Sequence, residues 1–378
     1  MVRLVSNSFI QDLVSILHKL KIKKTGKKPD WSQLPKELLQ LISERLDSEL
    51  YRLRFRSVCS SWRSSSSPNY HQNHLPLKLP EFSDIKNSYL IKHNIFLIKS
   101  PTNSIPWLIR VGPKLNGKTH LWDPRDIYYT LPFYLQIHLN LALDLNKLSI
   151  IDLGHVFYIH DSDPGGYVYP RKVIGVGEQP IAIVTCEYSG EPMIFHCGDD
   201  HWMNIPDVPN VEKSHGDICN FKGRPCVIDR TGRTVMIESD LTVHLVAEPC
   251  FGGNIKFLVE SKCQLLLVDR YESDGSSGGD LRIDVFRLDE KEKNWVKLPN
   301  LGDRVLFLGE GCSFSAFASD LGFANGNCVI FCADDMSIFH LDKDRISPLS
   351  DYPDYFNLFL WPPPKWIAAA ITKYVILD

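Results

Sequence analysis

"PMIFHCGDDHWMNIP", residues 192–206, resembles a later stretch of the chain, "IDVFRLDEKEKNWVKLP", residues 283–299. Both contain a short apolar run, a polar turn, and a tryptophan followed after two residues by Ile or Leu and then Pro. "MSIFHLDKDRISPLS", residues 336–350, repeats the first half without the tryptophan, and "GRTVMIESDLTVHLVAEP", residues 232–249, has the same rhythm. Short β-branched runs bounded by turn residues are typical of strands, so the sequence predicts a repeated strand–turn–strand unit.

The spacing of this unit indicates the fold class. The second predicted strand of each unit falls near residues 203, 244, 296 and 346, which gives gaps of 41, 52 and 50 residues. A repeat of about 40–50 residues with four short strands is typical of a β-propeller blade. We therefore predict a mainly β protein in which residues 80–378 form a β-propeller of about six blades. The repeated tryptophans, Trp202 and Trp295, are expected to pack between blades.

Other segments of this region are read in the same way. "VIDRTGRTVMI", residues 227–237, predicts a β-hairpin whose turn is centred on Thr231 and Gly232. Residues 131–160, "LPFYLQIHLNLALDLNKLSIIDLGHVFYIH", fit either strands of one blade or an inserted helix. The sequence leaves these two alternatives open.

Composition and charge narrow the class of protein. The chain has 378 residues, 44% of them hydrophobic and 23% charged, which is ordinary for a globular protein of more than one domain. The net charge is −3, and residues 1–29 hold seven basic residues against one acidic, so residues 30–378 carry −9. An acidic β region does not favour nucleic acid as a partner. No apolar run reaches 18 residues and no secretory signal is visible, so we expect no membrane partner and an intracellular protein of the nucleus or cytoplasm.

The cysteines favour the same interpretation. The chain has ten of them without any C-x-x-C pair, and many lie inside apolar runs, namely Cys59, Cys186, Cys197, Cys219, Cys226, Cys250, Cys263, Cys312, Cys328 and Cys332. This pattern predicts reduced, buried thiols rather than a disulfide framework.

Residues 1–29 form a basic N-terminal extension. "FIQDLVSILHKL", residues 9–20, has the apolar spacing of a helix, and the lysine-rich "KLKIKKTGKK" ends it. Three interpretations stay open here: a packed helix with a solvated basic tail, a nuclear-import signal, or a targeting or membrane-surface segment.

Residues 30–67 have a helical pattern. In "DWSQLPKELLQLISERL", residues 30–46, leucine or isoleucine recurs every four residues and Pro35 is expected in the first helical turn. "DSELYRLRFRSVCSSWRS", residues 47–64, predicts a second helix that Asp47 or Ser48 caps. A linker rich in Pro and His follows over residues 68–79. The helical region carries more leucines than so small a core needs.

The sequence carries few signatures of catalysis or of metal binding. The chain has no G-x-S-x-G, H-E-x-x-H, Walker or G-x-G-x-x-G motif. The acidic loops at residues 160–166 and 269–280 lack the spacing of a calcium loop. His196, Cys197 and His201 are close in sequence, but adjacent strand residues point to opposite faces, which disfavours a joint metal site. We therefore expect no catalytic residue, no metal and no cofactor.

"LPKELLQLISERLDSELYRLRFRSVCSSWRS", residues 34–64, closely resembles an F-box, a small helical domain that binds the Skp adaptor of cullin-based ubiquitin ligases. The family pattern is Leu-Pro, a leucine-rich helix, and a second helix that ends in Val-Cys-x-x-Trp-Arg. The resemblance explains the leucines, since the adaptor buries what the domain's own core does not. It implies a set of adaptor-binding residues: Leu34, Pro35, Leu38, Leu39, Ile42, Leu53, Arg54, Val58, Cys59 and Trp62.

The remaining chain resembles the plant KIB-type F-box proteins, whose C-terminal region is a predicted β-propeller. The resemblance rests on blocks such as "WMNIPDVP", "FKGRPCVIDRTG", "FLVESKCQLLLVDRY" and "DRVLFLGEGCSFSAFAS". One departure is "WPPPKWI", residues 361–367, where the family commonly has Trp-Phe/Ile-x-Pro. This difference bears on how the last blade closes.

The resemblance implies a function. We expect a non-catalytic substrate-recognition subunit of a Skp–cullin–F-box (SCF) ubiquitin ligase, in which the F-box binds the adaptor and the propeller binds an unknown target protein. One alternative is an F-box protein that sequesters a partner without forming a ligase. The other is an enzyme, since propellers also host active sites.

Overall fold

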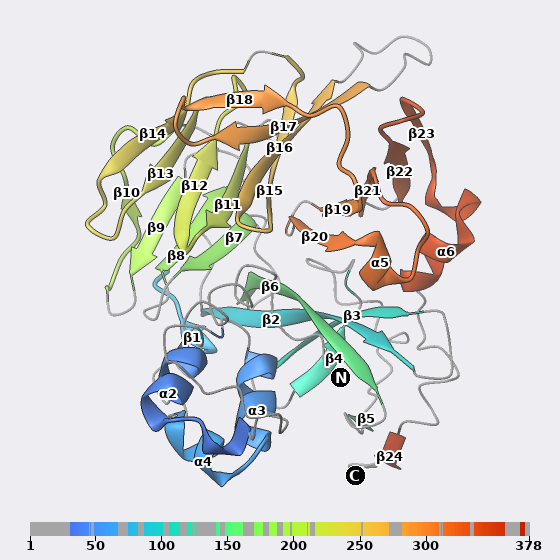
Figure 1. Cartoon of the computed structure of the whole chain (residues 1–378). Helices are drawn as coiled ribbons and strands as arrows, with labels where there is room; N and C mark the ends of the chain where they lie inside the picture. Colours follow the sequence, from blue (N-terminus) through green and yellow to red (C-terminus); the bar gives the residue numbers. More distant parts are fainter. Residues whose placement is uncertain are drawn as a thin grey trace, which may run out of the picture. The chain divides into compact units, whose positions relative to one another are not determined.

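The computed structural model describes residues 31–359 with gaps, the longest of which are 67–74, 125–140, 162–169 and 272–281, together with residues 371–374 (Figure 1). The chain divides into two compact units, Met1–Pro68 and Asn69–Asp378. We call them the helical unit and the propeller unit. The predicted helix within residues 1–29 and the two predicted caps, Asp47 and Ser48, lie outside the described residues.

The helical unit contains a 3₁₀ turn and three short helices: η1 (Trp31–Gln33), α2 (Lys36–Glu44), α3 (Glu49–Ser57) and α4 (Ser60–Ser65). Helix α2 begins one residue after Pro35, whose carbonyl oxygen accepts hydrogen bonds from the N–H groups of Leu38 and Leu39, both at 3.1 Å. Pro35 therefore lies just before the first helical turn instead of inside it, and its carbonyl oxygen accepts the first hydrogen bonds of the helix.

The predicted second helix is two helices, α3 and α4. The break comes at Cys59, whose backbone is extended (φ −163°, ψ 177°) and whose carbonyl accepts a hydrogen bond from the N–H of Arg63 at 3.0 Å. Arg56 joins the two helices, since its Nη1 donates to Ser66 Oγ at 3.0 Å and to the carbonyl oxygen of Ser66. Periodicity cannot detect such a break, because the apolar spacing continues across it.

The propeller unit is built almost entirely of strands. Its strands in chain order are β1 (Leu77–Lys78), β2 (Ser88–Lys99), β3 (Trp107–Pro113), β4 (Thr119–Trp122), β5 (Leu141–Leu143), β6 (Ser149–Asp161), β7 (Pro170–Val176), β8 (Ile181–Cys186), β9 (Pro192–His196), β10 (Met203–Asn204), β11 (Asp217–Phe221), β12 (Arg224–Ile228), β13 (Thr234–Ile237), β14 (Val243–Ala247), β15 (Ile255–Ser261), β16 (Gln264–Tyr271), β17 (Arg282–Asp289), β18 (Asn294–Lys297), β19 (Arg304–Leu308), β20 (Ser313–Phe317), β21 (Cys328–Phe331), β22 (Ser337–His340), β23 (Arg345–Pro348) and β24 (Ile371–Tyr374). Short helices complete it: α5 (Ala318–Leu321), η4 (Leu349–Asp351), α6 (Pro353–Phe356) and η5 (Asn357–Phe359). The mainly β prediction is confirmed.

The strands pair into one nine-stranded sheet, two four-stranded sheets, one five-stranded sheet and the pair β24–β5. The nine-stranded sheet consists of two four-stranded groups, β6-β2-β3-β4 and β7-β8-β9-β10, with β1 added at the side of β2. The two groups share a single residue pair, Phe157 opposite Val173. The described residues therefore contain five blade-like groups: these two, β11–β14, β15–β18 and β19–β23.

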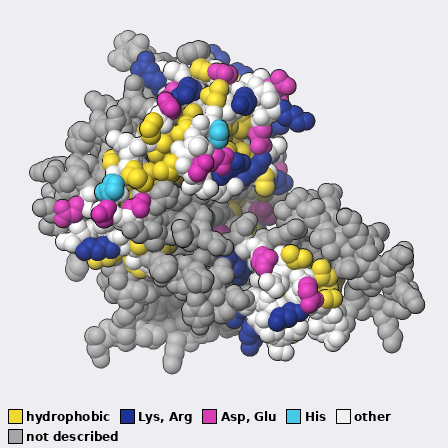
Figure 2. Space-filling view, turned by 90° about the vertical axis from the view of Figure 1, so that its left-hand side faces the viewer, with side chains coloured by type: hydrophobic (Ala, Val, Ile, Leu, Met, Phe, Trp, Pro, Cys, Tyr) yellow, Lys and Arg dark blue, Asp and Glu magenta, His cyan; other side chains and the backbone are white. Residues whose placement is uncertain are grey.

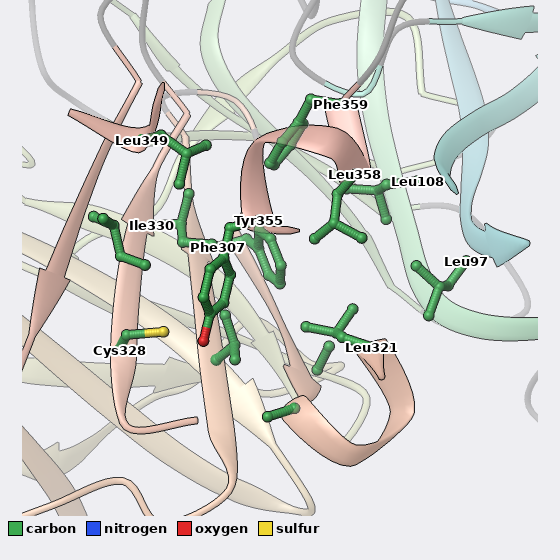
Figure 3. Packing of buried hydrophobic residues seen from close by; sticks show 14 of the residues in the cluster. Leu97, Leu108, Phe307, Leu321, Cys328, Ile330, Leu349, Tyr355, Leu358 and Phe359 are labelled. Atoms are coloured by element: carbon green, nitrogen blue, oxygen red, sulfur yellow. The ribbon is translucent and has the colours of Figure 1, made fainter. Parts of the chain in front are cut away.

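Five hydrophobic clusters join these groups in a circle. Each of four clusters packs one group against the next, from the β2 group through to the β19–β23 group. The fifth cluster returns to the start, because Leu108 of β3 packs beside Leu358 of η5, and the same cluster holds Leu97 of β2 and Phe307 of β19 (Figure 3). Groups that pack face to face and close on themselves are the arrangement of a β-propeller, which leaves no sheet face without a partner.

The predicted repeat is confirmed strand by strand. Residues 203, 244, 296 and 346 lie in β10, β14, β18 and β23, each the last strand at the edge of its group. Trp202 and Trp295 are both 9% exposed, and each indole donates to a backbone carbonyl of the preceding group or the segment leading into it, Trp202 to Pro80 at 3.3 Å and Trp295 to Gly232 at 3.1 Å. The tryptophans thus connect neighbouring blades by a hydrogen bond as well as by packing.

The blade number differs from the prediction of about six. The described residues form four sheets of four or more strands, and five blade-like groups when the nine-stranded sheet is divided at its single shared pair. The predicted number of blades assumed that every blade uses the same length of chain. Strands β2 and β6 have 12 and 13 residues, so the first group uses more chain than a repeat of average length.

The predicted hairpin is present as β12 and β13. Its turn is held by Asp229, whose Oδ1 accepts hydrogen bonds from the N–H of Thr231 at 2.8 Å and of Arg233 at 3.1 Å. Gly232 has φ of 89°, a backbone conformation that glycine adopts without strain.

Residues 131–160, for which the sequence left strands or a helix open, form strands where the structure describes them, in β5 and β6. The "WPPPKWI" segment lies outside the described residues.

The end of the predicted linker belongs to the propeller unit. Leu77 and Lys78 form β1 and pair with Leu90 and Tyr89 of β2. Leu79 is 4% exposed and packs in the cluster that joins β2, β6, β7 and β9. A boundary at residue 80 would therefore cut through the fold. The linker prediction missed this segment because two strand residues are too few to show a period.

Candidate functional site

The helical unit presents an unusual amount of apolar surface. Among the described residues, five large hydrophobic side chains count as exposed, and three of them lie in this small unit: Trp31 at 49%, Leu41 at 48% and Val58 at 55%. Single exposed apolar side chains are normal on a monomer, but three large ones within so small a unit favour a protein-binding surface.

The predicted adaptor-binding residues differ in how much surface they offer. Pro35 is exposed, and Leu34, Leu38 and Ile42 are half-buried at i, i+4 spacing along the start of the unit and α2. These four side chains form one apolar stripe with a solvent-accessible side. Leu39, by contrast, is 0% exposed. We therefore assign Leu39 to the interior of the unit rather than to its surface.

The second half of the motif divides in the same way. Val58 is exposed and Cys59 is half-buried at the break between α3 and α4. Leu53 lies in α3, and the guanidinium carbon of Arg54 lies 6.0 Å from the ring centroid of Tyr51. Trp62 is half-buried, and its ring centroid lies 4.6 Å from that of Phe55, which is a core residue.

Trp62 also fixes the position of Trp31. The indole Nε1 of Trp62 donates a hydrogen bond to the carbonyl oxygen of Trp31 at 3.0 Å, which ties η1 to α4. The adaptor-binding residues that the F-box resemblance implied include Trp62 but not Trp31 or Leu41. Trp31 was missed because the motif begins at Leu34. Leu41 was not predicted as a surface residue, because the apolar spacing shows only that it belongs to the stripe. Whether its side chain is exposed depends on how the three helices pack.

The described residues hold no group of three or more His, Cys, Asp or Glu side chains arranged to bind a metal. His201 and Asp200 do lie together, with Nδ1 and Oδ1 2.5 Å apart. Their hydrogen bond raises the pKa of His201 and lowers that of Asp200, and both side chains are exposed. An exposed pair of this kind is an ordinary surface contact.

The three buried thiols of the propeller unit are poor nucleophiles, whereas Cys263 is exposed. Burial raises the pKa of Cys219 to about 12, and it raises that of Cys328 to about 12 as well. The pKa of Cys226, which lies directly opposite Cys219 on the neighbouring strand, is raised for the same reason. The described cysteines are free, which agrees with the expected reduced thiols.

Surface charge and helix hydropathy give no further candidate site among the described residues. On the face that Figure 2 shows, basic and acidic side chains are interspersed, without a continuous region of either sign. Among the helices that the structure describes, none has the length and the apolar character needed to span a bilayer.

Comparison with known families agrees with both units. The F-box domain family matches residues 31–72, and the family described as KIB1-4 beta-propeller matches residues 67–352. The two matches together cover the helical unit's described residues and nearly all of the propeller unit's strands.

Curated relatives match over almost the whole chain. The F-box protein SKIP23 of Arabidopsis thaliana is 33% identical over 399 residues, covering 90% of this chain and 96% of its own length. The Arabidopsis F-box protein At2g17036 is 28% identical, covering 90% of this chain and 95% of its own. Among solved structures, a virginiamycin B lyase from Staphylococcus aureus aligns with a TM-score of 0.29 and 12% identity over 73% of this chain and 75% of that one.

The apolar stripe along α2, the closed circle of blade-like groups and the two family matches agree with one another. This chain is a plant F-box protein of the KIB1-4 beta-propeller family.

Proposed function

We propose that this protein is the substrate-binding subunit of an SCF-type ubiquitin ligase. The F-box binds a Skp-type adaptor and, through it, the cullin. The propeller unit binds a target protein whose identity the sequence does not name. The chain itself catalyses no reaction and needs no metal or cofactor. Its contribution is a high effective concentration of the target's lysine near the ubiquitin-loaded enzyme.

The observation that carries the proposal is the exposed apolar surface of the F-box. Pro35, Val58 and Leu41 are exposed in the chain alone, and the half-buried Leu34, Leu38 and Ile42 extend the same apolar character along α2. An amphipathic helical surface of this kind is covered by a complementary helical partner. The family match supplies the kind of partner, since F-box domains as a class bind Skp-type adaptors.

The structure also suggests different roles within the motif. Leu34, Pro35, Leu38, Ile42 and Val58 have surface with which to contact the adaptor. The role of the predicted Leu39 is then to support α2 from inside the unit. Arg54, Cys59 and Leu53 keep their predicted place at the interface as part of the proposal.

The test is the double substitution Leu34→Ala and Pro35→Ala in the full chain. Truncating apolar side chains at a buried interface typically costs about 2 kcal/mol or more for each anchoring residue, so adaptor recovery should fall below detection. Gln40→Ala is the matched control, because Gln40 is exposed on the same helix and bonds only with Glu44 among the described residues. Unchanged adaptor recovery with the double variant would refute the proposed interface.

Recovery of the cullin separates the ligase from the sequestering alternative. A ligase subunit should bring down adaptor and cullin together, and its target should accumulate when the proteasome is inhibited. A protein that only sequesters a partner should bring down the adaptor without cullin. We further propose residence in the nucleus and the cytoplasm, where such ligases act, with the basic residues 1–29 as the segment that decides between them.

A further inference from the structure

The outer strand edges of the blade-like groups differ in how well they are protected. Four groups end in a strand whose side chains the structure describes and which pairs with a described strand on one side only: β10, β14, β18 and β23. An unpaired strand edge offers a row of N–H and C=O groups to any extended chain. Proteins usually block such an edge with a very short strand, a charged side chain or a proline.

Three of these four strands are blocked in one of these ways. Strand β10 has only two residues, β18 ends in Lys297, and β23 begins with Arg345 and ends with Pro348. Strand β14 reads Val-His-Leu-Val-Ala, which makes it the longest of the four, and it holds no acidic residue, lysine, arginine or proline. Its one irregularity is a register shift that skips Val246, after the regular part of the strand. The edge of β14 is therefore the least protected of the four.

Hydrogen bonds of the β13–β14 hairpin determine which backbone groups of β14 point outward. The N–H of Glu238 donates to the carbonyl oxygen of Thr242 at 2.9 Å, so these two residues form a hydrogen-bonded pair. Hydrogen-bonded and non-hydrogen-bonded pairs alternate along an antiparallel ladder, so His244 bonds to β13, whereas its two neighbours in the strand do not. Val243 and Leu245 therefore turn their N–H and C=O groups away from β13, toward the open edge.

The side chains along this edge are accessible to a partner. Val243 and Leu245 are half-buried, and His244 is exposed. Val243 borders the cluster between the β7–β10 and β11–β14 groups, which the half-buried Met203 and Ile205 also border. Apolar side chains gather on the side of the propeller unit that carries β10 and β14 (Figure 2). An extended chain beside β14 would thus meet apolar side chains as well as backbone groups.

The charge near the start of β14 is negative. The carboxylate of Asp240 is exposed in the turn before the strand, where its Oδ1 accepts hydrogen bonds from the N–H and the Oγ1 of Thr242, at 3.0 and 2.6 Å. These bonds, and to a smaller extent the neighbouring His244, lower the pKa of Asp240. At the other end, Glu248 lies next to Lys293, whose carbonyl oxygen accepts its N–H at 2.9 Å. A basic residue in the partner therefore complements the start of the strand rather than its end.

We propose that β14 binds an extended segment of the target protein as a fifth strand of its sheet. The segment forms backbone hydrogen bonds with Val243 and Leu245, places apolar or β-branched residues beside them, and carries a basic residue near Asp240. In strand addition the main-chain hydrogen bonds supply affinity, and alternate side chains supply specificity. The inference rests on the proposed function, in that it takes the propeller unit as the target-binding region, and it names the class of segment that is bound. It does not depend on adaptor binding.

The test uses the full chain and a fluorescein-labelled peptide, Lys-Thr-Val-Thr-Val-Thr-Val-Thr, followed by fluorescence anisotropy. Wild type should bind it saturably, with a dissociation constant below about 1 mM. The same peptide with Pro-Pro at its centre cannot pair as a regular strand, and it should bind at least about tenfold more weakly. Hydrogen exchange of the full chain should show slower exchange of the Val243 and Leu245 amides when the first peptide is bound, because both amides then have an acceptor.

Two substitutions test the edge itself. Leu245→Pro removes one outward N–H and no hydrogen bond to β13, so it should weaken peptide binding about tenfold. His244→Lys places a charge on the edge through an exposed side chain, and it should weaken binding about fivefold or more. Val296→Lys is the matched control, because Val296 is 38% exposed on the outermost strand of another group, and it should change affinity by about twofold at most. If Leu245→Pro lowers the melting temperature, His244→Lys and the exchange measurement decide the result.

Several results would overturn the proposal. These are the absence of saturable binding up to about 1 mM, unchanged affinity with His244→Lys, and binding without slower exchange of the two amides. Sedimentation tests the other occupant, a second copy of this chain. A wild-type dimer that His244→Lys converts to a monomer would show that β14 pairs with itself, and this also overturns the proposal.

Adaptor recovery distinguishes this inference from the proposed F-box interface. Leu245→Pro and His244→Lys should recover the Skp-type adaptor as wild type does, because both substitutions lie outside the F-box. Loss of peptide binding with normal adaptor recovery supports the inference. Failure of the Leu34→Ala and Pro35→Ala test would refute the adaptor interface and leave this peptide assay unaffected.

Discussion

Leu79 lies just before the predicted boundary of the propeller, and its truncation tests whether that boundary is correct. The side chain is 4% exposed and packs in one cluster with Leu90, Phe157, Val173 and Phe195. Replacing a buried leucine by alanine removes its transfer free energy and leaves a cavity, which together cost about 2–5 kcal/mol. For a domain of this size about 1 kcal/mol corresponds to roughly 2–4 °C, so Leu79→Ala in the full chain should lower the melting temperature by about 4–20 °C.

Leu77→Ala is the matched control for this substitution. Leu77 belongs to the same short segment and the same residue type, but it is half-buried and only borders the cluster. Its truncation should lower the melting temperature by less than half as much as that of Leu79. Differential scanning fluorimetry of the three proteins measures this. Equal, small shifts for Leu77→Ala and Leu79→Ala would show that the segment before residue 80 is not part of the fold.

Fragments that begin at Asn69 and at Glu81 extend the same reasoning. The shorter one loses Leu79, the pairing of β1 with β2, and the carbonyl of Pro80 to which the indole of Trp202 donates. Lost burial of about 2–3 kcal/mol, an unpaired strand edge and the loss of an indole hydrogen bond together approach the lower end of the stability of a whole domain, about 5–15 kcal/mol. We expect the fragment from Asn69 to be soluble and rich in strand, and the fragment from Glu81 to aggregate. A soluble, cooperatively unfolding fragment from Glu81 would refute the boundary.

Three further predictions concern charges. The buried carboxylate of Asp217 accepts two hydrogen bonds from Lys172 Nζ, at 2.7 and 2.9 Å. Asp217→Ala should therefore lower the free energy of unfolding, measured in urea, by about 3–5 kcal/mol. Glu290→Ala, which breaks the exposed ion pair with Lys222, should lower it by about 1 kcal/mol or less. Burial, and after it the charge of Lys343, lowers the pKa of His340, so the unfolded chain binds the proton at a higher pH than the folded chain and stability should fall as pH drops below about 6.5. In melting temperatures measured against pH, His340→Gln should reduce this fall, and an unchanged pH dependence would contradict the prediction. If the basic extension directs nuclear import, replacing Lys21, Lys23, Lys24, Lys27 and Lys28 with glutamine should shift a fluorescent fusion toward the cytoplasm. An unchanged distribution would exclude the import signal and leave the solvated tail or the targeting or membrane-surface segment.

Local patterns were enough for the parts of the fold whose physics is local. The turn around Thr231 and Gly232 depends on one aspartate side chain and one glycine within a few residues, and both are visible in the sequence. The repeated tryptophans mark the last strand of two groups because each blade solves the same packing problem with the same residues. The F-box could be identified for a similar reason, since its Leu-Pro start, its leucine-rich helix and its Val-Cys-x-x-Trp-Arg end lie within about thirty consecutive residues.

Amphipathic spacing could not distinguish the inside of the F-box from its surface. Leu38 and Leu39 are neighbours of the same type, yet one is half-buried and the other has no exposed area. The difference comes from how α3 and α4 pack against α2, and that packing depends on a backbone break at Cys59 and on the arginine that spans it. The exposed Trp31 likewise depends on a hydrogen bond from a residue 31 positions away in the chain.

The sequence by itself determined that this protein is a leucine-rich helical domain followed by repeated strands, because hydrophobic period and turn chemistry act over a few residues. The tertiary structure alone decided how many groups close the circle and that Leu79 belongs to it. These features depend on contacts between residues distant in sequence, such as Leu108 with Leu358 across the closing boundary. Such contacts form only when the ring closes, and no stretch of consecutive residues records them.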